Sequence, residues 1–226
     1  MISLNRLILG VLWSLAILAF DDARASDLLI FDSSNLIALK SSRNLLGYYA
    51  ADDRNTSCAF YFYGSNDKPG KVENGTYRTT EIKTFVLAGK NYRYENRSRD
   101  FDIQGEIFVK GKEWVIRTSK NQAGCNNSTG VFRYTPLDRE AARYAVKNVL
   151  PALSIKVVKG KTFFKNNDAS LVKNRGFLVA GNVVAVLRES GNYSYVRFSH
   201  PATGTVTSGW IKTSDLQEPF PSSTMQ

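Results

Sequence analysis

Few side chains in this sequence could act as a nucleophile or as a base. The chain of 226 residues contains two cysteines, Cys58 and Cys125, and a single histidine, His200. A cysteine becomes a reactive thiolate only when a base or a positive charge lowers its pKa. The Ala-Gly-Cys sequence at Cys125 lacks the neighbouring His and Ser residues that Cys-based transpeptidases carry, and His200 lies far along the chain. We therefore predict no catalytic residues, and an enzyme that uses Cys125 and His200 is the alternative.

One further pattern has a catalytic form but lacks its partners. Residues 170–173 read Ser-Leu-Val-Lys, which matches the Ser-x-x-Lys pattern of penicillin-binding enzymes. The Ser-Asp-Asn and Lys-Thr-Gly elements that complete such a site are missing. The sequence also shows no Cys/His spacing for zinc and no Gly-rich phosphate loop. We therefore expect no metal and no cofactor, and we expect binding to be the function.

The N-terminal residues 1–25 have the features of a secretory signal peptide. Arg6 precedes an apolar run of fourteen residues, Leu7 to Phe20, and Ala23-Arg24-Ala25 forms a small-residue cleavage site. The run is shorter than the ~20 residues that a spanning helix needs, so an uncleaved anchor is the alternative. We expect a mature chain that starts at Ser26, lies in the bacterial periplasm or outside the cell, and has no membrane span.

Secretion changes the interpretation of the two cysteines. In an oxidising compartment an isolated pair of cysteines most simply forms a disulfide. A bond between Cys58 and Cys125 would close a long loop and could add ~3–4 kcal/mol to stability. We therefore predict a Cys58–Cys125 disulfide.

The chain is strongly basic, with a formal net charge of +10. Nucleic acid is not an expected partner for a secreted chain. The partner is then an acidic protein or the anionic cell envelope, and the alternative is a positive surface that serves only solubility. The densest basic and aromatic segment is NYRYENRSRD. Its candidate binding residues are Tyr92, Arg93, Tyr94, Arg97 and Arg99, and an exposed hairpin with no ligand is the alternative.

The composition favours β-structure throughout the mature chain. There are eleven Tyr and thirteen Phe residues, and aromatic and β-branched side chains suit pleated, half-buried surfaces. We predict an N-terminal antiparallel β domain over residues 26–135, held by the disulfide. Residues 28–46 have a mixed pattern that fits either a short strand or a helix. The clearer strands of this domain are expected at residues 58–63, 75–87, 101–109, 113–118 and 130–134.

Residues 136–151 predict a short linker helix between two β-rich halves. Asp138 can cap the helix, Glu140 and several alanines favour it, and Pro151 ends it. The second domain is expected at residues 152–218, followed by a disordered tail at 219–226. Its short, regularly spaced strands favour a sandwich or small barrel. They read IKVV, TFF, GFLVA, VVAVL, YSYVRF and TSGWI.

Several residues of this second half resemble a bacterial SH3-like domain of the SH3b type. They are Thr162-Phe163-Phe164, Gly176-Phe177-Leu178-Val179, Gly181, Val183–Leu187, Tyr195-Val196-Arg197-Phe198, Gly209-Trp210-Ile211 and Asp215-Leu216. The resemblance covers about Ser154 to Gln217 and implies an SH3-like β-barrel, which is a partly open one. It also implies a docking role, because many SH3b domains bind cell-wall peptides.

The same resemblance argues against binding of a proline-rich peptide. Where eukaryotic SH3 domains carry a Pro and an aromatic residue in the closing motif, this chain has Lys212 and Leu216, so the slots that grip polyproline are missing. The remaining candidate contacts are Tyr193, Tyr195 and Trp210. Tyr193 and Tyr195 are two residues apart and share a face; if that face points inward they are core residues, which is the expectation, and if outward they are contacts. Trp210 has the same two alternatives.

Two functions follow from these features. The first is a non-enzymatic inhibitor or immunity-type protein that blocks a secreted toxin or cell-wall hydrolase. Because many lysozymes are cationic, such a target would have to be neutral or acidic. The second is an envelope protein that docks on peptidoglycan through the SH3-like domain.

Overall fold

The computed structural model describes residues 26–52, 57–66, 71–73, 77–125, 132–166, 170–172 and 176–222. These residues are almost entirely β-strands and their connections, with two single-turn 3-10 helices, so the all-β prediction is confirmed. The predicted signal peptide at residues 1–25 lies outside the described residues. In the described ranges we find no helix with the length and apolarity to cross a membrane.

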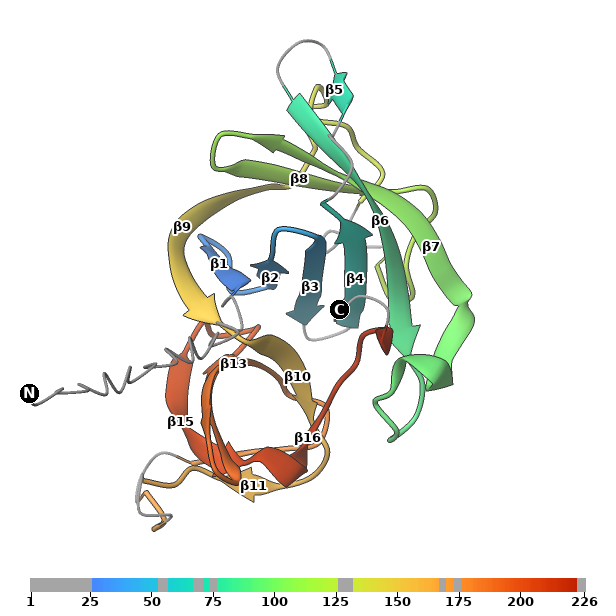
Figure 1. Ribbon diagram of the computed structural model, residues 1–226. Coiled ribbons are helices and arrows are strands. Elements are labelled where there is room, and N and C mark those ends of the chain that lie inside the picture. Colours follow the sequence, from blue (N-terminus) through green and yellow to red (C-terminus); the bar gives the residue numbers. More distant parts are fainter. Residues whose placement is uncertain are drawn as a thin grey trace, which may run out of the picture.

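The first sheet closes on itself. It consists of β1 (Ser26–Phe31), β2 (Leu36–Lys40), β3 (Asn44–Asp52), β4 (Ser57–Ser65), β5 (Lys71–Glu73), β6 (Tyr77–Leu87), β7 (Arg97–Lys110), β8 (Glu113–Thr118) and β9 (Arg143–Ala152). The strand order is β4-β3-β2-β1-β9-β8-β7-β6-β5, and β4 also pairs with β6. That last pairing joins the two sides, so all strands except β5 form an antiparallel barrel (Figure 1). A closed barrel leaves no unpaired strand edge.

Alternating residues of these strands fill the barrel interior, as the period of two requires. Phe31 of β1 contacts Trp114 of β8 across the interior, with ring centroids 5.2 Å apart. Gly47 of β3 lies opposite Phe62 of β4, and a Cβ at position 47 would overlap the Phe62 ring. The glycine therefore makes room for a fully buried aromatic side chain. The interior cluster also contains Leu29, Leu36, Tyr49, Phe60, Ile107 and Tyr144.

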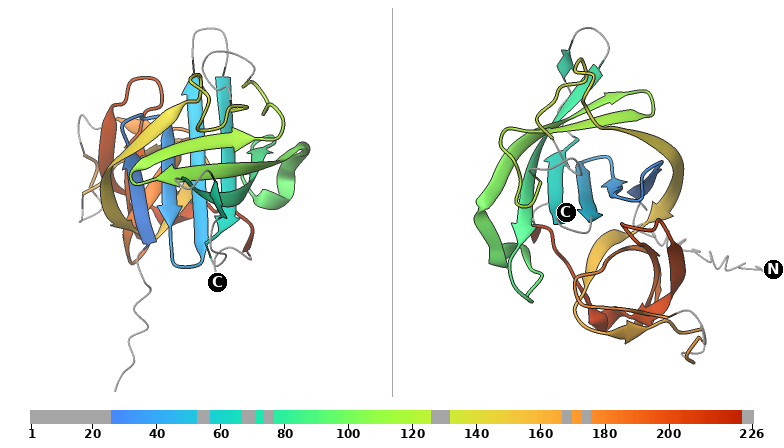
Figure 2. Two further views of the ribbon diagram at one scale, coloured as in Figure 1. Left: turned by 90° about the horizontal axis from the view of Figure 1, so that it is seen from above. Right: turned by 180° about the vertical axis from the view of Figure 1, so that it is seen from behind.

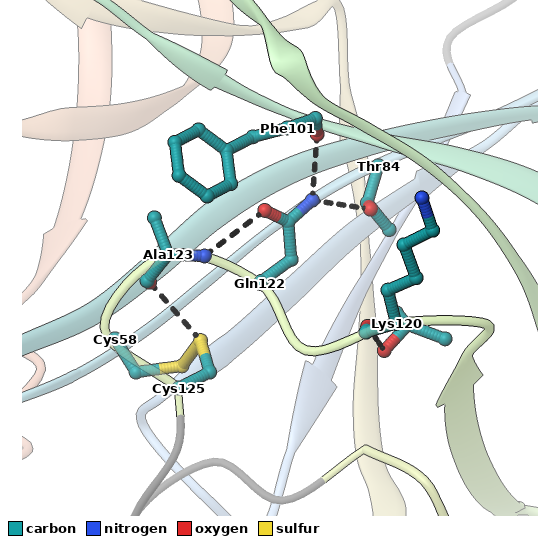
Figure 3. The surroundings of a disulfide bond; sticks show 8 residues. Cys58, Thr84, Phe101, Lys120, Gln122, Ala123 and Cys125 are labelled. Atoms are coloured by element: carbon teal, nitrogen blue, oxygen red, sulfur yellow. Dashed lines mark hydrogen bonds between the residues drawn. A yellow bond between two sulfur atoms is a disulfide. The ribbon is translucent and has the colours of Figure 1, made fainter.

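The segment that follows β8 is tied to β4 by the Cys58–Cys125 disulfide, so that prediction is confirmed. Gln122 in this segment is 2% exposed. Its side-chain amide donates hydrogen bonds to Thr84 Oγ1 and to the carbonyl of Phe101, at 2.5 and 2.9 Å (Figure 3). The disulfide and Gln122 therefore attach the segment to three neighbouring strands, β4, β6 and β7.

The predicted linker helix at residues 136–151 is wrong. Arg143–Ala152 form strand β9, which pairs with both β1 and β8. Two of the positions that gave the helical pattern are exposed, Leu137 at 69% and Val149 at 47%, so no apolar helix face exists. Asp138 accepts hydrogen bonds from the backbone and hydroxyl of Thr135 in a turn. Pairing with two neighbours therefore outweighs the weak helix propensity of this segment. The strand predicted at residues 130–134 is also absent from its described part, 132–134.

The strands predicted in the second half are present and form a separate sheet. They are β10 (Ser154–Val158), β11 (Thr162–Phe163), β12 (Phe177–Leu178), β13 (Val183–Ser190), β14 (Tyr193–Ser199), β15 (Val206–Lys212) and β16 (Leu216–Gln217). The order of the larger sheet is β15-β14-β13-β10-β16, and β11 pairs with β12 as a hairpin. We call residues 154–222 the C-terminal module. Its own core contains Val158, Phe164, Leu178, Val184, Val186, Val196, Ile211 and Leu216.

The barrel and the C-terminal module share a third core. Leu28 of β1, Tyr61 of β4 and Phe85 of β6 point outward from the barrel, yet they are 7% exposed or less. They pack in one cluster with Ile155, Val157, Val183 and Ala185 of the C-terminal module. Figures 1 and 2 show the module lying against the β1–β4 side of the barrel. The two predicted halves are therefore fused along a continuous apolar layer.

The last described residues extend this layer, so the predicted disordered tail at 219–226 is wrong for its first residues. Phe220 is 3% exposed and its ring contacts those of Tyr61 and Phe85 at 5.9 and 6.1 Å. The chain thus returns from the C-terminal module to the barrel wall. Residues 223–226 of the predicted tail lie outside the described part of the chain.

Glu218 in this returning segment makes stability depend on pH. Burial raises its pKa from 4.5 to about 7, although the Phe220 backbone and Lys156 partly oppose the shift. Because the folded state holds this proton more tightly, the stabilisation is complete below about pH 4.5 and is lost as the pH rises through about 7. The size of this pKa shift limits the pH-dependent contribution of Glu218 to the free energy of unfolding to about 3 kcal/mol, and partial exposure of the carboxyl group reduces it to about 2 kcal/mol.

We expect Glu218→Gln to remove this dependence. At about pH 8 the variant should be more stable than the parent by about 2 kcal/mol, and at about pH 4 the two should be equal. Urea unfolding at several pH values measures this. Glu140→Gln, which removes an exposed carboxyl group, is the matched control. Parallel stability curves for Glu218→Gln and the parent would contradict the assignment.

Candidate functional site

The tyrosines predicted on β14 lie on the outer face of the C-terminal module. Ser194 and Val196 are fully buried, and Val196 belongs to the module core. Tyr193 and Tyr195 alternate with them and are half-exposed. The inward alternative for these two tyrosines is therefore wrong, and their side chains are available on the surface.

Tyr195 belongs to a row of residues that lie opposite one another across neighbouring strands. Arg188 pairs with Tyr195, Tyr195 with Trp210, Trp210 with Lys165, and Lys165 with Leu171. Directly opposed residues in antiparallel pairs place their side chains on the same face. We call Arg188, Tyr195, Trp210, Lys165 and Leu171 the outer row. Its order is a cation, two aromatic rings, a cation and an aliphatic side chain.

The first three side chains of the outer row are in contact. The Tyr195 and Trp210 rings meet edge to face with centroids 5.3 Å apart. The Arg188 guanidinium carbon lies 4.5 Å from the Tyr195 centroid and 5.3 Å from that of Trp210. Trp210 itself is only 8% exposed, so Arg188 and Tyr195 present most of this surface. A guanidinium held over rings keeps its N–H groups at the edge, where they can donate to a carboxylate or phosphate.

Arg188 has no ion pair within the described residues. Its neighbour Glu189 is the nearest acid in sequence, but Glu189 pairs with Lys156 at 3.3 Å and accepts from the Ser194 hydroxyl. Arg188 is exposed. Its charge is therefore available to an external acidic group.

A second aromatic and cationic group lies beside the outer row. Phe163 and Phe177 pair across the β11–β12 hairpin and are 44% and 49% exposed. Lys161 Nζ lies 4.2 Å from the Phe177 centroid and 5.3 Å from that of Phe163. Phe163 precedes Lys165 by two residues, so an extended backbone keeps the pair on the same face as the outer row. Leu171, the last member of the row, is 62% exposed. The face thus combines apolar side chains with cations.

The predicted loop patch is divided by the fold. Arg97 donates to both carboxylate oxygens of Asp102, at 2.8 to 3.0 Å, and its guanidinium stacks on Tyr94. Burial alone would raise the pKa of Asp102, but the hydrogen bonds and charge of Arg97, with Lys83 at 3.4 Å, lower it. These contacts hold the start of β7 in place, and they occupy the Arg97 charge.

The aromatic residues of that patch also have internal roles. The Tyr94 hydroxyl shares a hydrogen bond of 2.9 Å with the hydroxyl of Tyr63. Tyr92 packs on the core shared by the barrel and the C-terminal module, near Gly181. Of the five candidates, only Arg93 and Arg99 are exposed, and the other three are half-buried. A binding role for this patch remains a prediction that rests on these two arginines.

The side chains considered for catalysis have other partners. Cys125 is bonded to Cys58 and is 1% exposed, so in this form its sulfur is no nucleophile. His200 Nδ1 accepts the backbone N–H groups of Ala202 and Thr203. Lys173 of the Ser-x-x-Lys match lies outside the described residues. Within the described ranges, His, Cys, Asp and Glu side chains form no group of three that could hold a metal ion.

Sequence reasoning missed Arg188 and Lys165. Regular alternation would place Arg188 on the same inward face as the fully buried Val186. A register shift between these two residues turns Arg188 outward, opposite Tyr195, and bulges commonly redirect a side chain in this way. The sequence offers no signal of that bulge, whereas the Tyr195–Trp210 pairing follows once the β14–β15 register is known. No family model, curated protein or solved structure matches this chain.

Proposed function

We propose that this chain is a secreted, non-enzymatic binding protein of the bacterial envelope. In this proposal its partner is a toxin or cell-wall hydrolase, which it blocks by covering part of the partner's surface. The signal-like residues 1–25 and the disulfide are consistent with an oxidising compartment. The SH3b resemblance of the C-terminal module, with its five-stranded sheet and its β11–β12 hairpin, supports a docking role.

The outer row carries this proposal. Arg188 is exposed, lies on two aromatic rings and has no ion pair in the part of the chain that the structure describes. It suits an acidic side chain of a partner, because a guanidinium binds a carboxylate with two parallel hydrogen bonds. Arginine, tyrosine and tryptophan are also the residue types that dominate protein interfaces.

The neighbouring apolar group favours a protein as the partner. Phe163, Phe177 and Leu171 are large hydrophobic side chains that the fold leaves exposed. Contiguous exposed apolar surface on a soluble chain commonly marks an interaction site. The net charge of +10 speeds the approach of an acidic partner and repels a basic one. We therefore infer a neutral or acidic target.

An inhibition assay tests the proposal. Purified hydrolases of basic, neutral and acidic isoelectric point digest isolated cell-wall sacculi in the presence of the full chain. We expect stoichiometric inhibition of a neutral or acidic enzyme. Arg188→Gln should weaken it at least tenfold, which corresponds to ~1.4 kcal/mol. Arg139→Gln makes the same charge change at an exposed residue outside the outer row and should inhibit like the parent. Equal inhibition by Arg188→Gln and the parent would show that the outer row is not the surface that binds the hydrolase.

Docking on peptidoglycan is the second candidate, since aromatic rings beside cations also suit sugars that carry acidic peptides. Co-sedimentation of the full chain with undigested sacculi separates the two. If the parent sediments, Arg188→Gln stays in solution and no hydrolase is inhibited, docking replaces inhibition as the function. The full chain is required because the C-terminal module buries Ile155, Val157 and Val183 against the barrel.

A further inference from the structure

A small cleft lies where the C-terminal module meets the barrel, at the end of β14 away from the outer row. Its barrel side includes Leu28, Ile37 and Tyr48, and its module side includes Val183, Ala185 and Phe198. Its volume is about 60 Å³. A cavity needs ~10–15 Å³ on this measure to hold one water. The cleft therefore has room for a carboxylate group with one or two attached carbons.

Among the described residues that line the cleft, Arg197 alone is charged. It follows Tyr195 by two residues and shares its outward face, and it lies opposite Ala185, which is buried in the shared core. Arg197 is half-buried, and its guanidinium has no hydrogen bond or ion pair within the described residues. Burial lowers the pKa of Arg197. A partly desolvated cation without a counter-ion is costly, and a bound anion removes much of that cost.

The surroundings select the kind of anion. The polar side chains of Ser34, Asn35, Asn182 and Ser199 line the cleft beside Arg197, and the rest of the lining is mostly apolar. No Asp or Glu occurs among the lining residues. Inorganic phosphate would place charged oxygens against the aliphatic lining. A carboxylate with a short apolar group would pair with Arg197 and bury its carbons.

We propose that this cleft binds a carboxylate that carries a short apolar group, with Arg197 as its counter-ion. The site is distinct from the outer row and does not depend on the proposed function. Its small volume limits the contacts, so a free acid should bind with a Kd on the order of 1 mM. The same chemistry occurs in a free short-chain acid and at the C-terminus of a peptide that ends in alanine.

A titration followed by amide resonances tests the site. Propionate should shift the resonances of residues around Arg197 and Val183 in a saturable way, and propionamide, which has nearly the same shape without the charge, should not. Arg197→Gln should weaken propionate binding at least tenfold, Arg197→Lys should retain part of it, and Arg188→Gln should leave it unchanged. A melting temperature no lower than that of the parent shows that the Arg197→Gln variant is folded.

Two peptides that end in alanine, one with a free carboxylate and one amidated, identify the source of the ligand. Tighter binding of the free peptide than of propionate assigns the cleft to a peptide terminus, and weaker binding assigns it to a small acid. Identical shifts with propionate and propionamide, or equal affinity for Arg197→Gln and the parent, would overturn the proposal. Failure of the hydrolase assay leaves this result untouched, because the two tests use different arginines.

Discussion

Replacing Cys58 and Cys125 together by alanine should lower the free energy of unfolding by about 4 kcal/mol. The disulfide joins residues 67 apart in sequence, and restricting a loop of that length in the unfolded chain accounts for most of this figure. The bond also positions the segment that carries Gln122, which anchors to Thr84 and Phe101. Urea unfolding of the double variant and of the parent measures the difference.

Two controls accompany the double variant. The parent unfolded under reducing conditions should lose a similar amount of stability, and the native parent should show no titratable thiols. If the double variant were destabilised by less than about 1 kcal/mol, the disulfide would not be the main link between this segment and β4. Cys125→Ala in the hydrolase inhibition assay also tests the enzyme alternative. A folded variant that retains full inhibition removes Cys125 from any catalytic role.

Phe220→Ala should destabilise the whole chain by about 3 kcal/mol, as expected when a buried phenylalanine is truncated. The ring is 3% exposed and packs on Tyr61 and Phe85 of the barrel, although it belongs to the C-terminal segment. The loss should therefore appear in both halves at once. Phe163→Ala removes an exposed ring and is the matched control, with an expected change of less than about 1 kcal/mol.

The two halves can be followed separately during unfolding. Trp114 lies in the barrel interior and Trp210 in the C-terminal module. Variants that keep only one of them report each half by its fluorescence. A shared core predicts coincident midpoints, which Phe220→Ala lowers together. Two separate midpoints, with only one moved by Phe220→Ala, would show that the halves fold independently.

The features predicted from the sequence were those with a local cause. Cys58 and Cys125 were the only possible pair, and strands such as residues 113–118 showed their β-forming residues directly. The segment 28–46 was ambiguous because β1, β2 and β3 are buried on both faces, one in the barrel and one in the shared core. Such strands lose the polar alternation that identifies half-buried ones.

The features that the sequence concealed depend on distant partners. Residues 143–152 have the composition of a helix, but pairing with β1 and β8 decides their structure. Arg188 lies in the outer row because a bulge turns it outward. The charge of Arg97 is not available in the predicted patch because it pairs with Asp102. In both cases the residue type was visible in the sequence, but the strand register or the folded partner decided its surroundings.

Fluorescence of Trp210 tests the outer row as a binding surface most directly. Of the three tryptophans in the sequence, Trp13 lies in the expected signal peptide. In the chain that starts at Ser26, a Trp114→Phe variant therefore reports Trp210 alone. It is titrated with each hydrolase of the panel and with soluble cell-wall fragments. We predict a saturable change in Trp210 emission with the ligand that binds, at the same midpoint as inhibition or co-sedimentation, and loss of this change in Arg188→Gln. Binding that leaves Trp210 emission unchanged, or no response to any of these ligands, would contradict the account.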